Sequence, residues 1–492
     1  MAGVSAVSGK VADALLAQLL ADVDGAREEL AGLLAELVRF PSVNYGDGHP
    51  GLDGVPNGNE TPCATFLRDR LRAEGIAAEV FESAPGRGNL IARLGAAGDG
   101  PLGPLASPSV LFMAHLDVVP VEDAERWPYP PFAGAVEGGL VFGRGSHDAK
   151  SLAACEALVM LLLRRRGVRL GGDLALLAAA DEESGGRFGA GWVAAQPALA
   201  PLVRADVALN EGGGGALRSP AGLAYGFATG EKGRLELRFR VLGKPGHASA
   251  PWRASNALER AGVLLDRLRG YEPEVDTSHP LFGAVPPRFG LPAGLSPAAL
   301  PAALETLERQ HEPVADGLRA GSRLTLVPTM IQAGIKSNSI PASCLVTCDV
   351  RTLPGQDAAY VEAEMRRLLA DLPWVEIEVL TTAEANHSPY DHPFRETCHR
   401  ALRLALGRED VDLVPTLCSG FTDSRLLRPL GVAVYDFMPL HPQAESRDTG
   451  VHGTNERIEV EGLIARARFL MAAACLSLGA AAPVAAVRAA GA

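Results

Sequence analysis

Short apolar runs alternate with stretches of helical spacing in the first half of this chain, and this alternation limits the folds that it can adopt. Runs at 109–116, 174–180 and 205–209 are typical of strands, 140–143 of a short strand, and 151–166 has the spacing of a helix. Strands separated by helices form a sheet that helices cover on both faces. The sequence therefore predicts an α/β fold built on a mixed sheet flanked by helices.

The pattern changes near Gly233, where GRLELRFRVLG alternates polar and apolar residues as a half-exposed strand does. The elements expected after it are a helix at 255–268, strands at 325–333 and 343–352, a helix at 358–372 and a strand at 375–381. This βαββαβ order is typical of a ferredoxin-like open-faced sandwich, an α+β fold. We expect it to be a lid domain inserted into the larger sheet domain.

The expected domains are a first part of a catalytic domain over 1–232, a lid domain over 233–383 and a second part of the catalytic domain over 384–492. A Pro-rich segment, about 274–321, interrupts the lid and is expected to elaborate it. Residues 11–40 have helical spacing up to Pro41, and the turn-rich stretch 42–62 is expected to be a surface loop. The Ala-rich C-terminal tail is expected to fray.

The charge balance excludes some classes of partner. Among 492 residues, 46 Lys and Arg stand against 58 Asp and Glu, a formal net charge of -12. Nucleic acids and anionic membranes both select a basic protein surface. We therefore expect neither nucleic acid nor membrane as a partner.

The cysteines and the first residues bear on the compartment. Seven cysteines are scattered without a CxxC pair, which indicates neither a disulfide framework nor a thiolate zinc site. The first thirty residues lack a basic leader followed by an apolar core, and no apolar run approaches the roughly 20 residues that span a bilayer. A cytoplasmic location is the expectation.

Potential metal ligands follow four apolar runs. They are His115 and Asp117, then Asp148, then Asp181, Glu182 and Glu183, and finally Asn210 and Glu211; His452 lies in a fifth, loop-like context. In open α/β sheets, ligands collect beyond the carboxyl ends of the strands. Each motif alone is more often structural, but together and in this order they predict one shared crevice.

Two of these positions have roles other than direct ligation. His115 and Asp117 are two apart on a strand and face the same side, so Asp117 can accept the second ring N–H of His115 and fix its tautomer. Glu182 is adjacent to Glu183, and neighbouring carboxylates do not easily ligate the same site. Glu182 is therefore expected to be the general base, which takes a proton from water and passes it to the leaving amine. The alternative is that Glu182 is only a solvated neighbour.

The remaining donors suit two ions. A two-metal site needs a bridging carboxylate, and Asp148 is expected to be that bridge. Glu211 and His115 would hold one ion and Glu183 and His452 the other, or the pairing is reversed. Three carboxylates and a hydroxide would balance the charge of two Zn²⁺, although Co²⁺ or Mn²⁺ accepts the same donors.

The motifs HLDVVP, GRGSHDAK, DEESGG, LNEGG and HGTNER resemble those of the aminoacylase, glutamate carboxypeptidase and succinyl-diaminopimelate desuccinylase family of di-zinc metallopeptidases. WPYPPFAGAVEGGLVFGRG, LNEGGG and HGTNER are most similar to its carboxypeptidase S-like branch. The resemblance covers roughly residues 30 to 475. It implies a hydrolase that cleaves the amide bond of small peptides or N-acyl amino acids bearing a free carboxylate. The implied metal ligands are His115, Asp148, Glu183, Glu211 and His452, with Glu182 as base. It also implies a homodimer through the lid domain, for which the strand at 235–241 is a candidate.

Other motifs carry roles that only the resemblance implies. KPGHASAP resembles the lid motif whose histidine, here His247, polarises the scissile carbonyl, often from the partner subunit. SNSIPASCLVTCDVR resembles the segment that supplies Asn338 and Arg351 to the substrate carboxylate or the tetrahedral intermediate. An arginine fork is well suited to a carboxylate. SGFTDSR matches a glycine loop in which Gly420 offers its backbone to the substrate.

Some features leave alternatives open. The family often has Asp, Asn, Met or Cys after the bridging Asp, whereas here Ala149 follows, and we predict a cis peptide bond between Asp148 and Ala149. His147 either supports a neighbouring ligand or is structural. The enzyme is a peptidase or an N-acyl-amino-acid deacylase on the same site. A non-catalytic descendant that binds metal or peptide is a third alternative, against which the intact Glu182 argues.

Overall fold

The computed structural model describes residues 13–46, 48–52, 54–95, 100–443 and 449–482. The chain divides into two compact units, which are described separately. The first contains the described residues of Met1–Ala228, Ser388–Val414 and Thr422–Ala492, and the second contains Thr229–His387 and Pro415–Phe421. The tail that was expected to fray lies mostly outside the described residues, as do residues 11 and 12.

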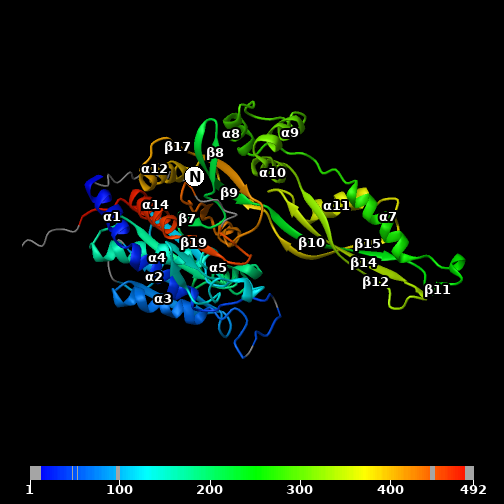
Figure 1. Cartoon of the computed structure of the whole chain (residues 1–492), viewed down its shortest axis with the longest axis horizontal. Coiled ribbons are helices and arrows are strands. Elements are labelled where there is room, and N and C mark those ends of the chain that lie inside the picture. The colour runs from blue at the N-terminus through cyan, green and yellow to red at the C-terminus, as the bar shows by residue number, and fades with distance from the viewer. Residues whose placement is uncertain (1–12, 47, 53, 96–99, 444–448, 483–492) are drawn as a thin grey trace, which may run out of the picture. The chain divides into compact units, whose positions relative to one another are not determined.

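A mixed sheet forms the centre of the first unit (Figure 1), with the order β1-β2-β6-β3-β7-β18-β9 and with β8 and β17 paired to β9. The strands are β1 (Ala77–Glu82), β2 (Gly88–Leu94), β3 (Ser109–His115), β6 (Asp173–Ala179), β7 (Val207–Asn210), β8 (Ala216–Ser219), β9 (Gly222–Glu231), β17 (Val411–Cys418) and β18 (Ala433–Asp436). Strands β6, β3, β7 and β18 pair in parallel, so their carboxyl ends share one edge of the sheet.

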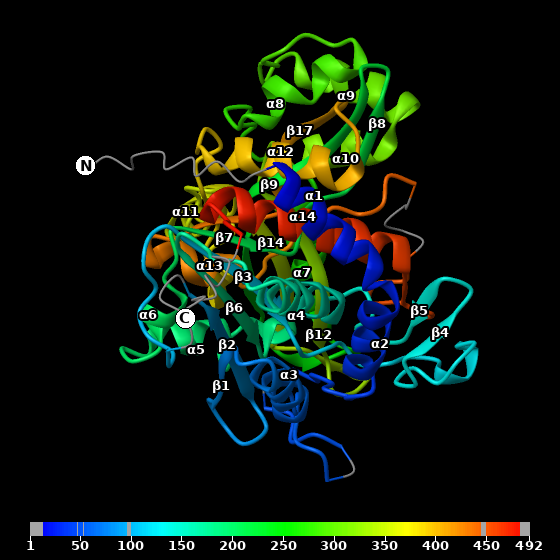
Figure 2. The same cartoon turned by 90° about the vertical axis from the view of Figure 1, so that its left-hand side faces the viewer.

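Helices cover both faces of this sheet, as predicted (Figure 2). Val110 and Phe112 of β3 pack in one apolar cluster, and Leu111 and Met113 pack in another, because successive strand residues point to opposite faces. Helices of the first cluster are α1 (Asp13–Gly25), α2 (Arg27–Val38), α3 (Thr61–Ala73), α4 (Lys150–Arg165), α12 (Phe394–Leu406) and α14 (Val460–Leu478). Those of the second are α5 (Ala190–Ala195), α6 (Ala200–Val203) and α13 (Ser424–Leu427).

The N-terminal region differs from its prediction in detail. The single helical stretch expected over 11–40 is two helices that meet at Ala26, and the expected loop 42–62 ends where α3 begins at Thr61. Both sides of the break bury leucines against the same cluster, such as Leu19 and Leu30. Apolar spacing therefore continues across a bend in the chain and could not reveal it.

One strand-end prediction was wrong. Strand β5 (Leu140–Phe142) belongs to a separate three-stranded sheet with β4 (Ala135–Glu137) and β19 (Arg457–Glu459). Asp148 therefore does not follow a strand of the main sheet. It lies in the loop that leads into α4, and α4 packs against β3 and sets the position of that loop.

The second unit contains an antiparallel sheet of order β12-β14-β10-β15 with two helices on one face (Figure 1). Leu237 and Phe239 of the sheet pack with Leu264, Val361 and Met365 of the helices, and the opposite face carries polar residues. This is the predicted open-faced sandwich. Its elements are β10 (Gly233–Leu242), α7 (Ala257–Arg269), β12 (Thr325–Ala333), β14 (Ser343–Thr352), α11 (Ala358–Leu368) and β15 (Val375–Ala383).

Smaller elements complete both units. In the second unit they are β11 (Gly246–His247), η3 (Pro251–Arg253), β13 (Ser339–Ile340) and β16 (Asn386–His387). In the first unit they are the short helices η1 (Ala124–Arg126), η2 (Glu182–Ser184) and η5 (Arg428–Leu430).

The Pro-rich segment forms four short helices rather than an extended loop. They are α8 (Leu281–Ala284), η4 (Pro286–Phe289), α9 (Leu300–Gln310) and α10 (Glu312–Gly321). Lys232 contacts the end of this segment. Its Nζ donates to the carbonyls of Ala320 at 2.8 Å and Arg323 at 2.7 Å. The lysine is buried, and burial lowers its pKa to about 8.

The strand that was expected to pair across a dimer lies inside its sheet, so this prediction was wrong. β10, which contains residues 235–241, lies between β14 and β15 in the sheet, so both of its edges are already hydrogen-bonded. It cannot pair with a second copy of itself. The edge strands of this sheet are β12 and β15. In the part of the chain that the structure describes, no helix has the length and apolar character to cross a bilayer.

Candidate active site

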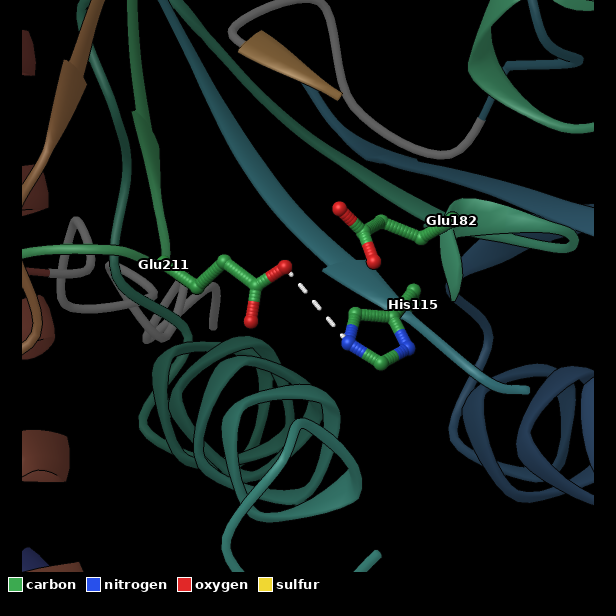
Figure 3. A group of neighbouring side chains, drawn as sticks. All are labelled: His115, Glu182 and Glu211. Carbon is green, nitrogen blue, oxygen red and sulfur yellow. Dashed lines mark ion pairs between the residues drawn. The ribbon is translucent and has the colours of Figure 1, made fainter. Parts of the chain in front are cut away.

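The parallel strands β3, β6 and β7 bring three candidates together at one edge of the main sheet. β3 ends at His115, Glu182 begins the short helix after β6, and Glu211 follows β7. Figure 3 shows the carboxylates of Glu182 and Glu211 around the ring of His115. Ligand atoms from these three residues lie within 4.8 Å of one another. Three of the predicted strand-end residues therefore converge as expected.

Asp148 lies between the two candidate histidines. Its Oδ1 is 3.0 Å from His115 Nε2, and its Oδ2 is 3.1 Å from His452 Nε2. Glu211 Oε1 lies 3.5 Å from His115 Nε2, and Glu183 Oε1 lies 3.3 Å from His452 Nε2. Each oxygen of Asp148 thus faces a different histidine–glutamate pair. The peptide bond between Asp148 and Ala149 is cis, as predicted.

Asp117 contacts more than the histidine. The nearest oxygen to His115 Nδ1 is the main-chain carbonyl of Asp117 at 3.0 Å, and the carboxylate lies at 3.4 Å. Its two carboxylate oxygens accept the backbone N–H groups of Glu182 and Glu183, each at 3.1 Å. A third donor is Asn44, whose Nδ2 lies 2.8 Å from Asp117. Asp117 therefore orients the loop of both glutamates, and Asn44 is a supporting residue that no pattern in the sequence indicated.

The carboxylates of this site are hard to ionise together. Burial raises the pKa of Glu211 to about 7 against the opposing charge of His115. Burial and the neighbouring Glu211 raise the pKa of Glu182 well above its usual value. Hydrogen bonds to Asp148 and Glu183 raise the pKa of His452 to about 10. Protonated histidine thus supplies positive charge to this cluster, and protonation of the glutamates removes negative charge from it.

A divalent cation fits this donor set. His115, Asp148 and Glu183 form a second group whose ligand atoms lie within 4.8 Å of one another, beside the group of His115, Glu182 and Glu211. Imidazole nitrogens and carboxylate oxygens are ligands that zinc and similar ions accept. Because Glu182 belongs to one of these groups, its geometry allows ligation as well as the predicted role of base.

His147 contributes through its backbone. Its N–H donates to Glu456 at 2.9 Å, and its carbonyl accepts the hydroxyl of Ser151 at 2.7 Å. Burial, followed by the charge of Arg466, lowers the pKa of the His147 ring to about 4. Among the described residues the ring Nε2 has no hydrogen-bond partner. The ring is therefore a half-buried group with a lowered pKa in the loop of Asp148.

The other four candidates lie in the second unit. His247 and Asn338 are neighbours there, because β11 pairs with β13 and the N–H of Ala248 donates to the carbonyl of Asn338 at 3.0 Å. His247 is exposed, and its Nδ1 lies 2.7 Å from the Ser249 hydroxyl.

Arg351 and Gly420 are the remaining two. Arg351 Nε donates to Asp349 at 2.7 Å, and its guanidinium lies 6.0 Å from the ring of Phe421, the residue after Gly420. The second unit thus contains two pairs of candidates, one of His247 and Asn338 and one of Arg351 and Gly420.

Comparison with known proteins identifies the family. The model of peptidase family M20/M25/M40 matches residues 111–475. The chain belongs to this family. The N-fatty-acyl-amino acid synthase/hydrolase PM20D1 of Mus musculus is 31% identical over 386 residues, which are 73% of this chain and 72% of that relative.

Two solved structures share the fold. The M20 family metallo-carboxypeptidase Sso-CP2 of Sulfolobus solfataricus has a TM-score of 0.65 at 17% identity and covers 92% of this chain and 99% of its own. Bacillus subtilis YXEP, a dinuclear metal binding peptidase from the M20 family, has a TM-score of 0.55 at 15% identity and covers 92% of this chain and 99% of its own.

These findings confirm the predicted family, the α/β fold with its inserted sandwich and the class of enzyme. The chain is a metal-dependent hydrolase of the M20/M25/M40 family. The roles of the individual site residues, the cytoplasmic location and the homodimer stay predictions.

Proposed function

We propose that the protein hydrolyses the amide bond of N-acyl amino acids and small peptides that bear a free carboxylate, with two Zn²⁺ as cofactors. The observation that carries the proposal is the position of Asp148, whose two oxygens face His115 at 3.0 Å and His452 at 3.1 Å. A carboxylate shared in this way, with one glutamate beside each histidine, is the arrangement that a pair of adjacent ions requires.

Two positions follow from this geometry. The first position is defined by His115, Asp148 and Glu211, and the second position by His452, Asp148 and Glu183. When bound, the ions supply Lewis acidity, which lowers the pKa of the attacking water and polarises the scissile carbonyl. Two imidazoles and three carboxylates form a mixed nitrogen and oxygen donor set that zinc accepts; cobalt and manganese are the alternatives on the same donors.

Glu182 is proposed as the general base. It is buried beside His115 and Glu211, and burial raises its pKa well above the usual value, which suits a group that takes and returns a proton. It takes a proton from water as the oxygen forms a bond to the carbonyl carbon. The same proton then passes to the leaving nitrogen as the C–N bond breaks, which releases a carboxylic acid and an amine.

The substrate carboxylate is assigned to the second unit. Arg351 offers a guanidinium held by Asp349 at 2.7 Å, and Asn338 and the backbone of Gly420 are proposed as further contacts. His247 is proposed to polarise the scissile carbonyl. These four roles rest on the motif resemblance, and a homodimer through the lid domain is proposed on the same ground.

Of the two substrate classes, we propose N-acyl amino acids as the preferred one. The relative that supports this choice is 31% identical over 73% of this chain and is named for N-fatty-acyl amino acids. A peptidase on the same site remains the second candidate, because the chemistry of the amide bond is shared.

The test is hydrolysis by the zinc-loaded protein of two matched panels, N-acyl amino acids and dipeptides with the same C-terminal residues. A chelated sample serves as control. Chelator-sensitive release of free amino acids supports the proposal, and the ratio of kcat/KM between panels selects the substrate class. Zinc binding without turnover on either panel would contradict it and favour a binding-only descendant.

A further inference from the structure

Two loops that carry metal-ligand candidates are joined by a buried residue that the chemistry above does not use. Asp148 lies in the loop between β5 and α4, and His452 lies in the segment before β19. Glu456, four residues after His452, belongs to the second segment but points its carboxylate into the first loop. Its exposed fraction is 1%.

The carboxylate of Glu456 is fully used by hydrogen bonds. Oε1 accepts the backbone N–H groups of His147 at 2.9 Å and Asp148 at 3.0 Å. Oε2 accepts the N–H of Gly145 at 3.0 Å and Arg144 Nη1 at 2.7 Å. A buried carboxylate is tolerated when donors satisfy both oxygens and a cation is paired with it. The carboxylate of Glu456 therefore binds the backbone of the loop that carries Asp148.

Arg144 extends the same contact back to His452. It is 2% exposed, and its Nη2 donates to the carbonyl of Gly453, the residue after His452, at 3.0 Å. A second carbonyl, that of Pro120, lies 3.4 Å from the same nitrogen. The main chain adds one more link, because the N–H of Gly143 donates to the carbonyl of Glu456 at 2.9 Å.

The contacts run in both directions between the loops. Glu456 comes from the His452 segment and holds the Asp148 loop, whereas Arg144 comes from the Asp148 loop and holds the His452 segment. A pair of buried, oppositely charged side chains therefore joins the two segments that carry Asp148 and His452. Among the described residues, Glu456 makes no such hydrogen bond to the end of β3, where His115 lies, or to the start of the loop after β7, where Glu211 lies.

We propose that Glu456 and Arg144 are positioning residues that hold Asp148 and His452 at the spacing of the second metal position. The inference rests on the proposed two-zinc site. Loss of the pair should weaken the ion held by His452, Asp148 and Glu183 more than the ion held by His115, Asp148 and Glu211, because only the His452 position depends on both segments that the pair joins. Hydrogen-bonding partners of metal ligands commonly change metal affinity by about 10- to 100-fold when removed.

The test measures zinc binding without any turnover, by titration of the metal-free protein against a competing chelator. Glu456→Gln keeps the side-chain volume but turns one acceptor into an NH₂ group that faces backbone donors. We expect wild-type protein to bind two zinc ions and Glu456→Gln to bind the second about 10- to 100-fold more weakly, with a smaller loss at the first, which shares Asp148. Arg144→Lys, which keeps a cation but loses the fork, should show the same selective loss to a smaller extent.

The control is Asp173→Asn. Asp173 is also buried, accepts the N–H of Ala106 at 2.8 Å and lies 4.0 Å from Arg93, but it stands at the opposite end of β6 from the site. Its substitution should lower the melting temperature and leave both zinc affinities unchanged. Equal weakening of both ions in Glu456→Gln and Arg144→Lys, or no weakening in either, would overturn the inference. Fewer than two zinc ions in the wild-type protein would instead overturn the proposed two-zinc site.

Discussion

The candidate residues of the two units differ in how they are held. In the first unit, His115 and Asp117 are buried at 1% and 0% exposure, and neighbouring strands and hydrogen bonds fix their positions. In the second unit, His247 and Asn338 are exposed on short segments, and Arg351 is half-buried beside Asp349. The first arrangement is preorganised, as the proposed metal and proton-transfer roles require. The side chains of the second unit are at least partly accessible to solvent, as the proposed substrate contacts require.

The largest expected effect belongs to the buried region. Glu182→Gln removes the proposed base without changing its size, and we expect kcat to fall by about 10²- to 10⁴-fold. Zinc content, measured by metal analysis, should remain at two per chain. Loss of an ion together with activity would mean that Glu182 is a ligand, which its proximity to His115 and Glu211 permits.

A smaller effect is expected at the half-buried arginine. Arg351→Ala removes a charged hydrogen-bond donor to the substrate carboxylate, and we expect KM to rise about ten- to a hundredfold with kcat less affected. The matched control is Arg238→Ala on the same face of the sheet, where the arginine pairs with Glu378 at 3.5 Å. If both variants behave alike, Arg351 has no special part in binding.

Metal binding should depend on pH in the buried region. Without metal the pKa of His452 is raised to about 10, and the carboxylates around His115 outweigh the effect of burial and raise its pKa as well. In the absence of metal both rings therefore favour the protonated form, and each must lose its proton to bind zinc. Apparent affinity should weaken by about tenfold per pH unit for each proton released as the pH falls. Calorimetry in two buffers of different ionisation enthalpy measures the proton count, and a count of zero would contradict these pKa directions.

The smallest effect on stability is expected at an exposed residue of the second unit. Ile335 is 99% exposed, so Ile335→Ser should change the free energy of unfolding by no more than about 0.5 kcal/mol. Phe239→Ala in the same unit, at 0% exposure, should cost about 3–5 kcal/mol through the cavity that it leaves. Chemical denaturation of the two variants measures the difference. A large effect of Ile335→Ser would show that this exposed segment is covered in solution.

Sequence reasoning predicted the site best where the geometry is local. His115, Glu182 and Glu211 follow parallel strands of one sheet, and parallel strands end at a common edge, so convergence follows from the strand pattern. The same rule misled us for β5, which belongs to another sheet, because three apolar residues do not say which sheet they join. The sequence pattern also could not show that 235–241 lies inside its sheet, because strand order depends on contacts between segments far apart in the chain.

The sequence by itself determined the layers of both units, the donor types of the metal centre and the residues at the strand ends, because these depend on periodicity and on the chemistry of single side chains. Only the tertiary structure decided that Asp148 faces both His115 and His452, and that Asn44, Arg144 and Glu456 form hydrogen bonds beside them. GRGSHDAK and HGTNER contain Arg144 and Glu456, yet nothing in either motif shows that they meet. Their hydrogen bonds join segments far apart in the chain, and such contacts form only when packing brings the segments together.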